Sequence, residues 1–377
     1  MKIETLSYNN DNWQINDEIF TNKDDVQLVL AFGDTDLFSD AKHYEHLRLQ
    51  YPKAKIVGSS SAGHLQGVQL SQSGIVASAI SFKNADVKLN VIDFEAGDDL
   101  EAVAQELVAA LPDEGLRSVF IISDGLYMNG TSLAGGVNAA KPNVLITGGL
   151  AGDGARFEKT FVMANAAPKE KRIAALGFYG ESLHVSSGCS AGWNEFGAER
   201  VITRSEANVV YEIDNEPALE LYKRYLGDEA KDLPGSGLHF PLSIRKNEED
   251  KGIIRTILAV DEERQSLTFA GDVPEGCLAR LMKTNIDGII DASTVAAKEI
   301  VQKNAKSALG LVVSCIGRKL VMKDLTDEEL ETIEETVGSN VYLTGFYSYG
   351  ELAPFSNDVL SCRLHNQTMT LTVMYED

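Results

Sequence analysis

The chain has 377 residues, of which 44% are hydrophobic, so it can bury a large core and is long enough for two or three domains. Its 56 acidic and 34 basic residues give a net charge of -22, which repels nucleic acid phosphates and anionic lipid surfaces. These properties predict a globular protein and exclude nucleic acid as the expected partner.

No apolar run approaches the roughly 20 residues needed to cross a bilayer, and the first residues lack the apolar segment of a signal peptide. We therefore expect a cytoplasmic protein without membrane insertion. The four cysteines are scattered and include no Cys-x-x-Cys pair, which favours reduced thiols over a zinc site or a disulfide framework.

From the N-terminus, the sequence predicts a strand pair or a lead-in over the polar residues 1–25 and then a first series of strands and helices. Hydrophobic runs, helical spacing and glycine or proline stops define these elements. They are a strand at 26–32, a helix at 38–50, a strand and glycine turn at 55–64, a hairpin within 68–94, a helix at 98–111, a strand at 118–123, a helix at 130–140, a second glycine turn at 144–153 and hairpin strands at 161–163 and 172–178.

A composition shift at residues 208–217 predicts a domain boundary, which assigns 26–210 to an N-terminal domain and 211–377 to a C-terminal domain. The elements expected after it are a helix at 218–227, a hairpin within 253–269, a helix at 293–302, a strand at 309–313, a helix at 328–337, a glycine-turn strand at 341–345 and a last strand at 368–374. The similar order in both halves predicts two related α/β units with mixed sheets, strand-helix-strand crossovers and hairpins, and a ligand cleft between them.

Three predicted strands end in a glycine turn, at residues 58–63, 148–153 and 345–350. The first and third share the pattern Gly-x-x-Ser-x-Gly, and the second is a looser version of it. Such turns offer backbone N–H groups and small side chains at the carboxyl edge of a sheet, which suits a carboxylate, a propionate or another polar ligand group. The alternative is that the glycines only allow a helix to pack close to the strand.

The first turn fails the tests for two kinds of catalytic loop. A P-loop needs Lys and then Ser or Thr after its second glycine, where this chain has His64 and Leu65. A nucleophile elbow needs Gly-x-Ser-x-Gly, and here the first glycine comes one residue too early. We therefore expect binding rather than enzyme activity. A hydrolase-like enzyme using Ser61, His64 and an acidic residue is the disfavoured alternative.

The candidate ligand-binding residues are small or polar residues of the turns and charged residues near strand ends. They are Gly58, Ser59, Ser60, Ser61, Gly63, His64, Asp124, Gly149, Asp153, Arg255, Ser348, Glu351 and Asn366. The carboxylates of this set are suited to an ammonium group and Arg255 to a carboxylate. Acidic residues at strand ends are also common caps of turns and helices, and that alternative stays open.

Five stretches together carry a resemblance to a known family, namely residues 57–63, 215–219, 273–276, 345–354 and 365–368. In this order they resemble the FIST sensory family over about residues 25–375. The resemblance implies a small-molecule-binding input module of bacterial signal transduction. Stand-alone members that the chain resembles bind haem, sense nitric oxide and regulate a separate histidine kinase of a two-component system. The alternative that the family implies is an amino-acid or small-metabolite sensor without haem.

If the ligand is haem, it needs a pocket and usually one axial side chain, most often histidine. Without a Cys-x-x-Cys-His motif such a haem would be non-covalent. His239, beside apolar residues in an irregular loop, and His365, next to the last strand, are the expected axial candidates. The sequence leaves the oligomeric state open.

Overall fold

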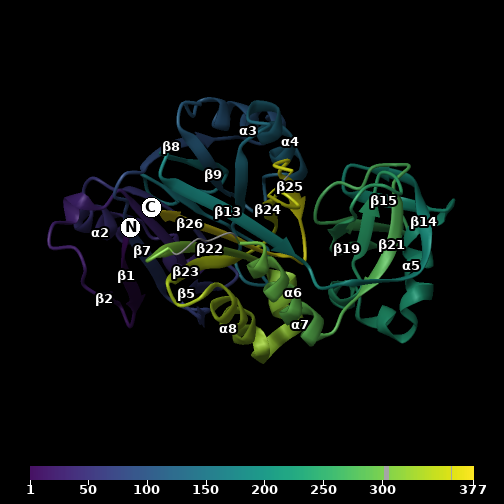
Figure 1. Cartoon of the computed structure of the whole chain (residues 1–377). Helices are drawn as coiled ribbons and strands as arrows, with labels where there is room; N and C mark the ends of the chain where they lie inside the picture. Colours follow the sequence, from purple (N-terminus) through teal and green to yellow (C-terminus); the bar gives the residue numbers. More distant parts are fainter. Residues whose placement is uncertain (301–304, 358) are drawn as a thin grey trace.

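The computed structural model describes residues 1–300, 305–357 and 359–377. Over these residues the protein has a large core of three six-stranded sheets and a smaller β body on one side of it (Figure 1). The sheets are mixed and helices cover them, so the α/β class predicted from the sequence is confirmed. The chain termini lie close together at the far end of the core from the β body (Figure 1).

The described part of the core repeats one four-stranded arrangement three times. The first unit consists of β1 (Lys2–Asn9), β3 (Leu28–Gly33), α1 (Thr35–Phe38), α2 (Ala41–Gln50), β4 (Lys55–Ser60) and β7 (Ile75–Ser81). The second consists of β8 (Asp86–Asp93), α3 (Leu100–Ala109), β9 (Leu116–Ser123), α4 (Gly130–Ala140), β10 (Leu145–Leu150) and β12 (Arg172–Tyr179). The third consists of β13 (Leu183–Ser190), α6 (Ile286–Lys298), β22 (Ala308–Cys315), α7 (Ile316–Met322), α8 (Thr326–Val337), β23 (Val341–Ser348) and β26 (Met369–Glu376).

The strand orders β4-β3-β7-β1, β10-β9-β12-β8 and β23-β22-β26-β13 show the repetition. In each unit the first two strands are parallel and a helical crossover joins them, while the other two pair antiparallel. The sequence predicts two related units, and the structure contains a third around the looser glycine turn.

Each sheet is completed by strands from another unit. The added strands are β5 (His64–Gln66) and β6 (Gln69–Ser71) beside β23, β11 (Val162–Ala164) beside β4, and β24 (Glu351–Ala353) and β25 (Arg363–His365) beside β10. The first unit thus extends the third, the second extends the first, and the third extends the second. This cyclic exchange makes the three units one folded body.

The inner faces of the three sheets share one hydrophobic cluster. It includes Phe32 from the first unit, Phe120 from the second and Phe346 from the third, and all three rings are buried. The rings of Phe32 and Phe346 stack with centroids 4.8 Å apart. Strands such as β3 and β22 are continuous apolar runs because sheet packs on one face and helices on the other.

The β body is built from residues 194–283, which are inserted into the third unit. Its elements are β14 (Asn194–Glu206), β15 (Val209–Ile213), β16 (Glu216–Pro217), α5 (Ala218–Leu226), η2 (Gly227–Asp232), η3 (Gly235–His239), β17 (Leu242–Arg245), β18 (Ile253–Arg255), β19 (Ile257–Asp261), β20 (Ser266–Phe269) and β21 (Leu278–Lys283). It has its own hydrophobic cluster, centred on residues such as Leu219, Tyr222 and Phe269. The predicted boundary between residues 210 and 211 falls inside β15.

Of the two alternatives for residues 1–25, the structure contains the strand pair, because β1 pairs with β2 (Asn12–Asp17), and β1 also pairs with β7 along seven residues. Two other local predictions need correction. The strands predicted as a hairpin within 68–94 are β7 and β8, which lie in different sheets, and β11 and β12 do not pair with each other either. Alternation of apolar and polar residues identifies a strand but does not say which strand it pairs with. The hairpin within 253–269 is confirmed as β19 and β20.

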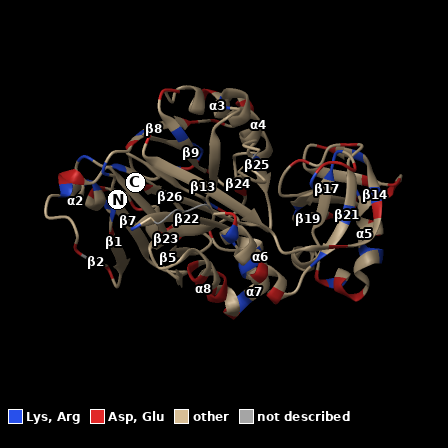
Figure 2. Cartoon of the chain, viewed as in Figure 1, with Lys and Arg blue, Asp and Glu red and all other residues tan. Residues whose placement is uncertain are grey.

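Charge is unevenly distributed over the fold (Figure 2). Acidic side chains are prominent on α8 and at the edge of the β body, while the sheets of the core carry few charges. The helix predicted at 293–302 is α6, which begins seven residues earlier, and residues 301 and 302 lie outside the described residues. No helix within the described ranges is long and apolar enough to cross a membrane.

One glycine in each unit permits a close approach between the two parallel strands. Gly58, Gly148 and Gly345 stand opposite Ala31, Ile121 and Val312 in the strand ladders. A Cβ atom on these glycines would lie 1.7, 2.0 and 1.8 Å from the carbonyl oxygens of those partners. Only glycine fits at these positions, because the clash would be with backbone that cannot rotate away.

We expect Gly58→Ala to lower the free energy of unfolding by about 3 kcal/mol or more, because the strand pair must separate to admit the methyl group. Urea denaturation of the purified variant measures this. Gly235→Ala is the matched control, since a Cβ atom there meets nothing within 4 Å. Equal stability of the two variants would contradict the close approach.

Candidate functional site

The three glycine turns meet at the centre of the core and bond to one another. The backbone N–H groups of Ala62, Gly152 and Tyr349 donate to the carbonyl oxygens of Tyr347, Ser60 and Leu150, at 2.9, 3.2 and 3.1 Å. Each turn therefore donates to a different turn, in a closed cycle. The N–H groups of these three residues are already paired within the protein.

Small residues of the turns are likewise buried inside the core, and Ser59 Oγ has no hydrogen-bond partner there among the described residues. Gly58, Ser59 and Gly149 lie inside buried strands, and Gly63 adopts a positive φ of 139°. Ser60 Oγ accepts the backbone N–H of Phe161 at 2.9 Å.

Ser61 and His64 are neighbours, but both are closed off from solvent. Their exposed fractions are 5% and 1%, and Ser61 Oγ lies 3.2 Å from His64 Nδ1. The other ring nitrogen lies 3.2 Å from the carbonyl oxygen of Ser73. Burial lowers the pKa of His64 to about 4, so the ring is neutral at physiological pH. The geometry is that of a buried hydrogen-bonded turn.

The predicted carboxylates are saturated with internal donors. Asp124 accepts three backbone N–H groups, each at 2.8 Å. Asp153 accepts three more and also the hydroxyl of Tyr349. Glu351 accepts the hydroxyl of Ser348 at 2.6 Å and that of Thr368 at 2.9 Å. These acids therefore hold loops and strands in place, which is the capping role that the sequence left open.

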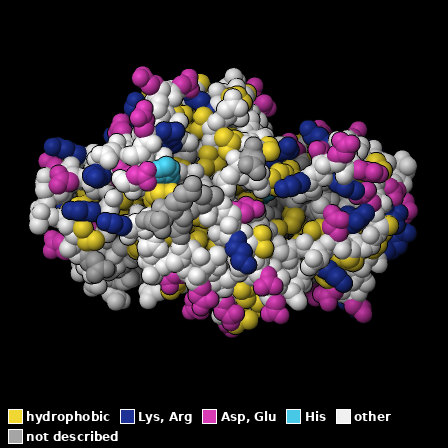
Figure 3. All heavy atoms as spheres, in the orientation of Figure 1, with side chains coloured by type: hydrophobic (Ala, Val, Ile, Leu, Met, Phe, Trp, Pro, Cys, Tyr) yellow, Lys and Arg dark blue, Asp and Glu magenta, His cyan; other side chains and the backbone are white. Residues whose placement is uncertain are grey.

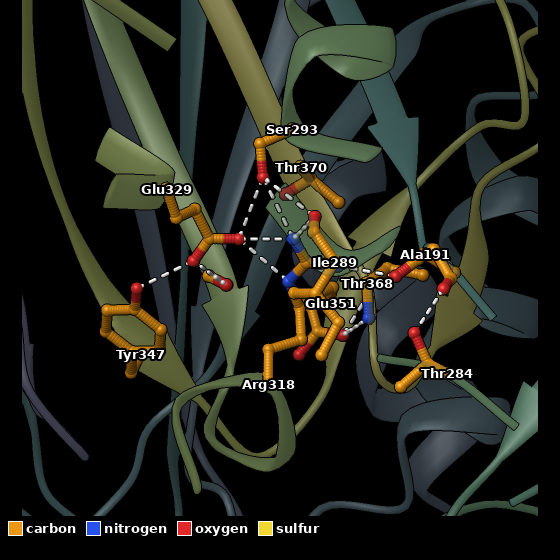
Figure 4. Close-up of polar contacts among 12 residues, drawn as sticks. Ala191, Thr284, Ile289, Ser293, Arg318, Glu329, Tyr347, Glu351, Thr368 and Thr370 are labelled. Atoms are coloured by element: carbon orange, nitrogen blue, oxygen red, sulfur yellow. Dashed lines mark hydrogen bonds and ion pairs between the residues drawn. The ribbon is translucent and has the colours of Figure 1, made fainter. Parts of the chain in front are cut away.

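Arg318 and Glu329 form a buried ion pair that no sequence motif marks (Figure 4). Both side chains have zero exposure. Arg318 Nε donates to Glu329 Oε1 at 2.8 Å, and the Tyr347 hydroxyl donates to the other carboxylate oxygen at 2.7 Å. Ser293 and Ser314 donate to the same carboxylate, so the buried charges are fully hydrogen-bonded.

The Arg318 guanidinium also holds both connections between the core and the β body (Figure 4). Nη1 donates to the carbonyl oxygen of Ala191 at 2.6 Å, and Nη2 to that of Ile289 at 2.9 Å. Ala191 precedes β14, where the chain enters the β body, and Ile289 lies on α6, where it has returned. Thr284 Oγ1 donates to Gly192 at 2.6 Å and joins the two connections directly. We call these two connections the hinge.

A large pocket lies where the β body meets the core, and we call it the basic pocket. Its volume is about 570 Å³, and its walls come from α4, from β17 and β18 with the loop between them, and from the segment before and within β25. The ionisable side chains in its lining are Arg245, Lys246, Glu249, Asp250, Lys251, Arg255, Asp272 and Arg363. The lining has five basic and three acidic side chains, and Arg245 is paired with Glu199 at 2.6 Å, so a small positive excess remains in a chain with a net charge of -22. The space-filling view shows basic and apolar side chains where core and β body meet (Figure 3).

Arg255 is the predicted site residue that lines this pocket. Its side chain is only 4% exposed, and its hydrogen bonds go to backbone carbonyl oxygens, at 3.1 Å to Asp272, 3.1 Å to Leu364 and 3.2 Å to Ile254. It forms no ion pair with any acidic residue in the described part of the chain. Burial lowers the pKa of Arg255 to about 10, so the guanidinium stays charged at neutral pH.

Asn366 lies beside Arg255 but supports the junction. Its side-chain oxygen accepts the backbone N–H of Thr256 at 3.4 Å, and it is 1% exposed. Asn366 therefore links the last part of the core to the β body. The sequence reasoning missed the pocket because its walls come from segments more than 100 residues apart.

A second pocket lies beside the basic pocket, and we call it the aromatic pocket. Its volume is about 320 Å³, and Leu364 lines both pockets. Its floor contains Leu150 and Tyr349 at the ends of the glycine turns, and its opposite wall comes from β19 and β20 of the β body. The second and third glycine turns thus contribute side chains, Leu150 and Tyr349, to the lining of a pocket. Their backbone N–H groups are paired within the protein.

The two histidines predicted as haem ligands lie elsewhere. His365 is 2% exposed, its Nε2 lies 3.0 Å from the carbonyl oxygen of Ala353, and burial lowers its pKa to about 4. His239 is exposed at the end of η3. Neither lines the basic or the aromatic pocket. No group of three or more His, Cys, Asp or Glu residues able to hold a metal occurs among the described residues.

Two models of known protein families match the chain. The FIST N domain matches residues 27–216 and the FIST C domain matches residues 218–354. Together they cover most of the chain, which therefore belongs to the FIST family. Domains of this family are sensory, ligand-binding domains of signal transduction.

The curated relatives are themselves uncharacterised. The chain is 22% identical over 329 residues to a protein of Methanocaldococcus jannaschii, covering 82% of this chain and 62% of that protein. It is 22% identical over 251 residues to a protein of Mycobacterium bovis, covering 64% and 63%. The chain thus spans less than two thirds of the length of these relatives.

Two solved structures align with the chain at low similarity. A cyanuric acid hydrolase from A. caulinodans is 7% identical, with a TM-score of 0.38, over 94% of this chain and 91% of that one. A chorismatase is 8% identical, with a TM-score of 0.35, over 99% and 98%. At this similarity they say nothing about the activity of this chain.

The buried carboxyl of Glu351 gives folding a pH dependence. Burial raises its pKa to about 8 from an ordinary 4.5, so the folded protein retains a proton that the unfolded chain releases. This contribution to stability is complete below pH 4.5 and is lost as the pH rises to about 8. We expect the free energy of unfolding to fall across that window with a slope on the order of 1 kcal/mol per pH unit.

Glu351→Gln should flatten this slope, because the amide cannot ionise, and urea denaturation at several pH values measures it. Glu376→Gln is the control. Burial alone would raise the pKa of Glu376, but backbone hydrogen bonds from Lys83, Asn84 and Ala85 outweigh burial and lower the pKa. The ionisation of Glu376 therefore changes the free energy of unfolding only below about pH 4.5. An unchanged slope in Glu351→Gln would refute the assignment.

Proposed function

We propose that this protein senses a small organic anion, with a carboxylate as the preferred group, bound in the basic pocket. The observation that carries the proposal is Arg255, a buried guanidinium that lines a pocket and hydrogen-bonds to backbone carbonyl oxygens but to no carboxylate of the described residues. The charge of the Asp272 carboxylate acts on Arg255 without a direct contact between the two side chains. A buried charge that lacks a paired carboxylate is costly, and a ligand carboxylate would offer a bidentate partner.

The remaining lining favours a ligand that also has an apolar part. Ile253, Pro274 and Phe355 contribute apolar surface, and Lys251 lies over the Phe355 ring at 5.7 Å from its centroid. The volume of about 570 Å³ is typical of small-molecule sites. Amino acids and related carboxylate metabolites have this combination of groups.

Binding there would bias the position of the β body relative to the core. Arg255 belongs to the β body, whereas α4 and Leu364 belong to the core, so a ligand in the pocket contacts both. A ligand shifts such an equilibrium only if it binds one arrangement more tightly. The hinge held by Arg318 is the part of the structure about which the β body would move.

The sequence also predicts haem as the ligand, nitric oxide as the signal and a histidine kinase as the partner, and our proposal treats the ligand and the partner separately. Neither pocket has a histidine in its lining, and the basic pocket offers Arg255 for a carboxylate, so the carboxylate ligand takes the place of haem in our proposal. A separate signalling enzyme, with a histidine kinase as the first candidate, remains the proposed partner on the family resemblance alone.

The ligand proposal predicts the behaviour of Arg255→Gln in a thermal-shift screen with amino acids and small carboxylates. We expect wild-type protein to be stabilised by at least one compound, and that compound to bind roughly 100-fold more weakly to the variant. Arg204→Gln, an exposed arginine of the β body, is the control. Equal ligand-induced shifts in wild type and Arg255→Gln would refute the proposal.

Haemin titration tests the competing ligand. We expect only weak, unsaturable Soret absorbance, because neither His239 nor His365 lines the basic or the aromatic pocket. A saturable Soret band that nitric oxide shifts, and that His239→Ala or His365→Ala abolishes, would overturn our choice of ligand in favour of haem.

A further inference from the structure

The aromatic pocket differs chemically from its neighbour. None of the Lys, Arg, Asp, Glu or His residues of the described chain lines it, whereas eight such residues line the basic pocket. Its lining is mostly apolar, aromatic and glycine-rich, with Asn129 and Asn208 as its amide side chains. An anionic ligand that Arg255 would attract therefore finds no partner here.

Three large hydrophobic side chains are left exposed around this pocket. Of the nine such residues in the described part of the chain, Tyr127, Phe157 and Leu258 line it, at 48%, 45% and 44% exposure. Scattered apolar side chains are ordinary on a protein surface, but a cluster around a concave site marks a place where apolar ligand is taken up.

The Phe157 ring is held in place at a conformational cost. It stacks on Tyr349 with ring centroids 4.4 Å apart and an interplanar angle of 17°. Its backbone has a φ of 56°, in the left-handed region that a bulky residue rarely adopts. Asp153 maintains this loop by accepting the Phe157 N–H at 2.8 Å. Strain of this kind persists where the surrounding structure enforces it, and such positions cluster at ligand sites.

Tyr349 is fixed from the other side. Its hydroxyl donates to the Asp153 carboxylate and accepts the backbone N–H of Asp153 at 3.1 Å. The hydroxyl is thus satisfied, and what remains for a ligand is the apolar body of the stacked pair. Planar rings bind such surfaces by offset stacking and by exclusion of water.

We propose that the aromatic pocket is a second binding site, separate from the basic pocket, for an uncharged planar aromatic group. The pocket lies between the core and the β body, so an aromatic ligand would contact both. It would then influence the position of the β body about the same hinge as the anion does. Leu364, shared by both linings, and Arg255, which bonds to the Leu364 carbonyl, connect the two sites physically.

The test uses indole as an uncharged planar probe, with binding measured by saturation-transfer NMR titration of the full chain. We expect saturable binding to wild type and roughly 10-fold weaker binding to Phe157→Gly. Glycine tolerates the positive φ, so this variant removes the ring without adding strain and should stay folded. Leu49→Ala is the control, because Leu49 is 84% exposed on α2, outside the pocket lining.

Equal indole affinity in Phe157→Gly and wild type, or binding that does not saturate, would overturn the proposal. Lys251→Gln distinguishes the two sites, because Lys251 lines the basic pocket and not the aromatic pocket. It should leave indole binding unchanged, and indole binding beside Phe157 is expected even if no carboxylate ligand is found. A loss of indole binding in Lys251→Gln as large as in Phe157→Gly would show one continuous site and would refute a separate one.

Discussion

The core depends on backbone contact where three strand ends converge. Each glycine turn donates an N–H to the next turn, and in each unit a glycine lets two parallel strands approach to a distance that a side chain would prevent. The three sheets can then share one apolar interior, with Phe32, Phe120 and Phe346 in a common cluster. The same constraint makes the turns themselves poor ligand sites, because their polar groups are consumed in holding the units together.

The places left for ligands are therefore peripheral to that centre, where the β body lies against the core. One side of the junction is apolar and aromatic, and the other carries an excess of positive charge. The buried Arg318–Glu329 pair affects both sides of this junction, because Arg318 fixes the two hinge connections to the core. A buried ion pair is weak evidence for stability, but it is well suited to specifying one arrangement of the elements it joins.

Much of the fold could be predicted from local signals. Apolar runs, helical spacing and caps located most helices and strands, and the glycine turns marked the carboxyl ends of β4, β10 and β23. Pairing partners could not be predicted, because β11, β5 and β24 complete sheets of other units and nothing in their sequence names the partner. The three-unit repeat was harder to see because the 90-residue β body interrupts the third copy.

The candidate site likewise contains residues that the local sequence predicts and residues that it does not. Arg255 was identified because a basic residue near a strand end suits a carboxylate, and it lines a pocket. Asp153 and Glu351 have the same kind of sequence context but are saturated by local donors, which depends on loop geometry that the sequence does not show. Arg318 was missed because burial and partners 11 to 127 positions away give it its role.

The chain leaves the core for the β body and returns to the core at adjacent points. There Thr284 Oγ1 donates to the carbonyl oxygen of Gly192 at 2.6 Å. An insertion with such closely spaced ends places almost no geometric demand on the fold that carries it. The recognition surface can therefore change in length and side chains over evolutionary time while the strand register of the core stays intact. In this sense the chain combines a core framework with an inserted module that forms one wall of both proposed ligand pockets.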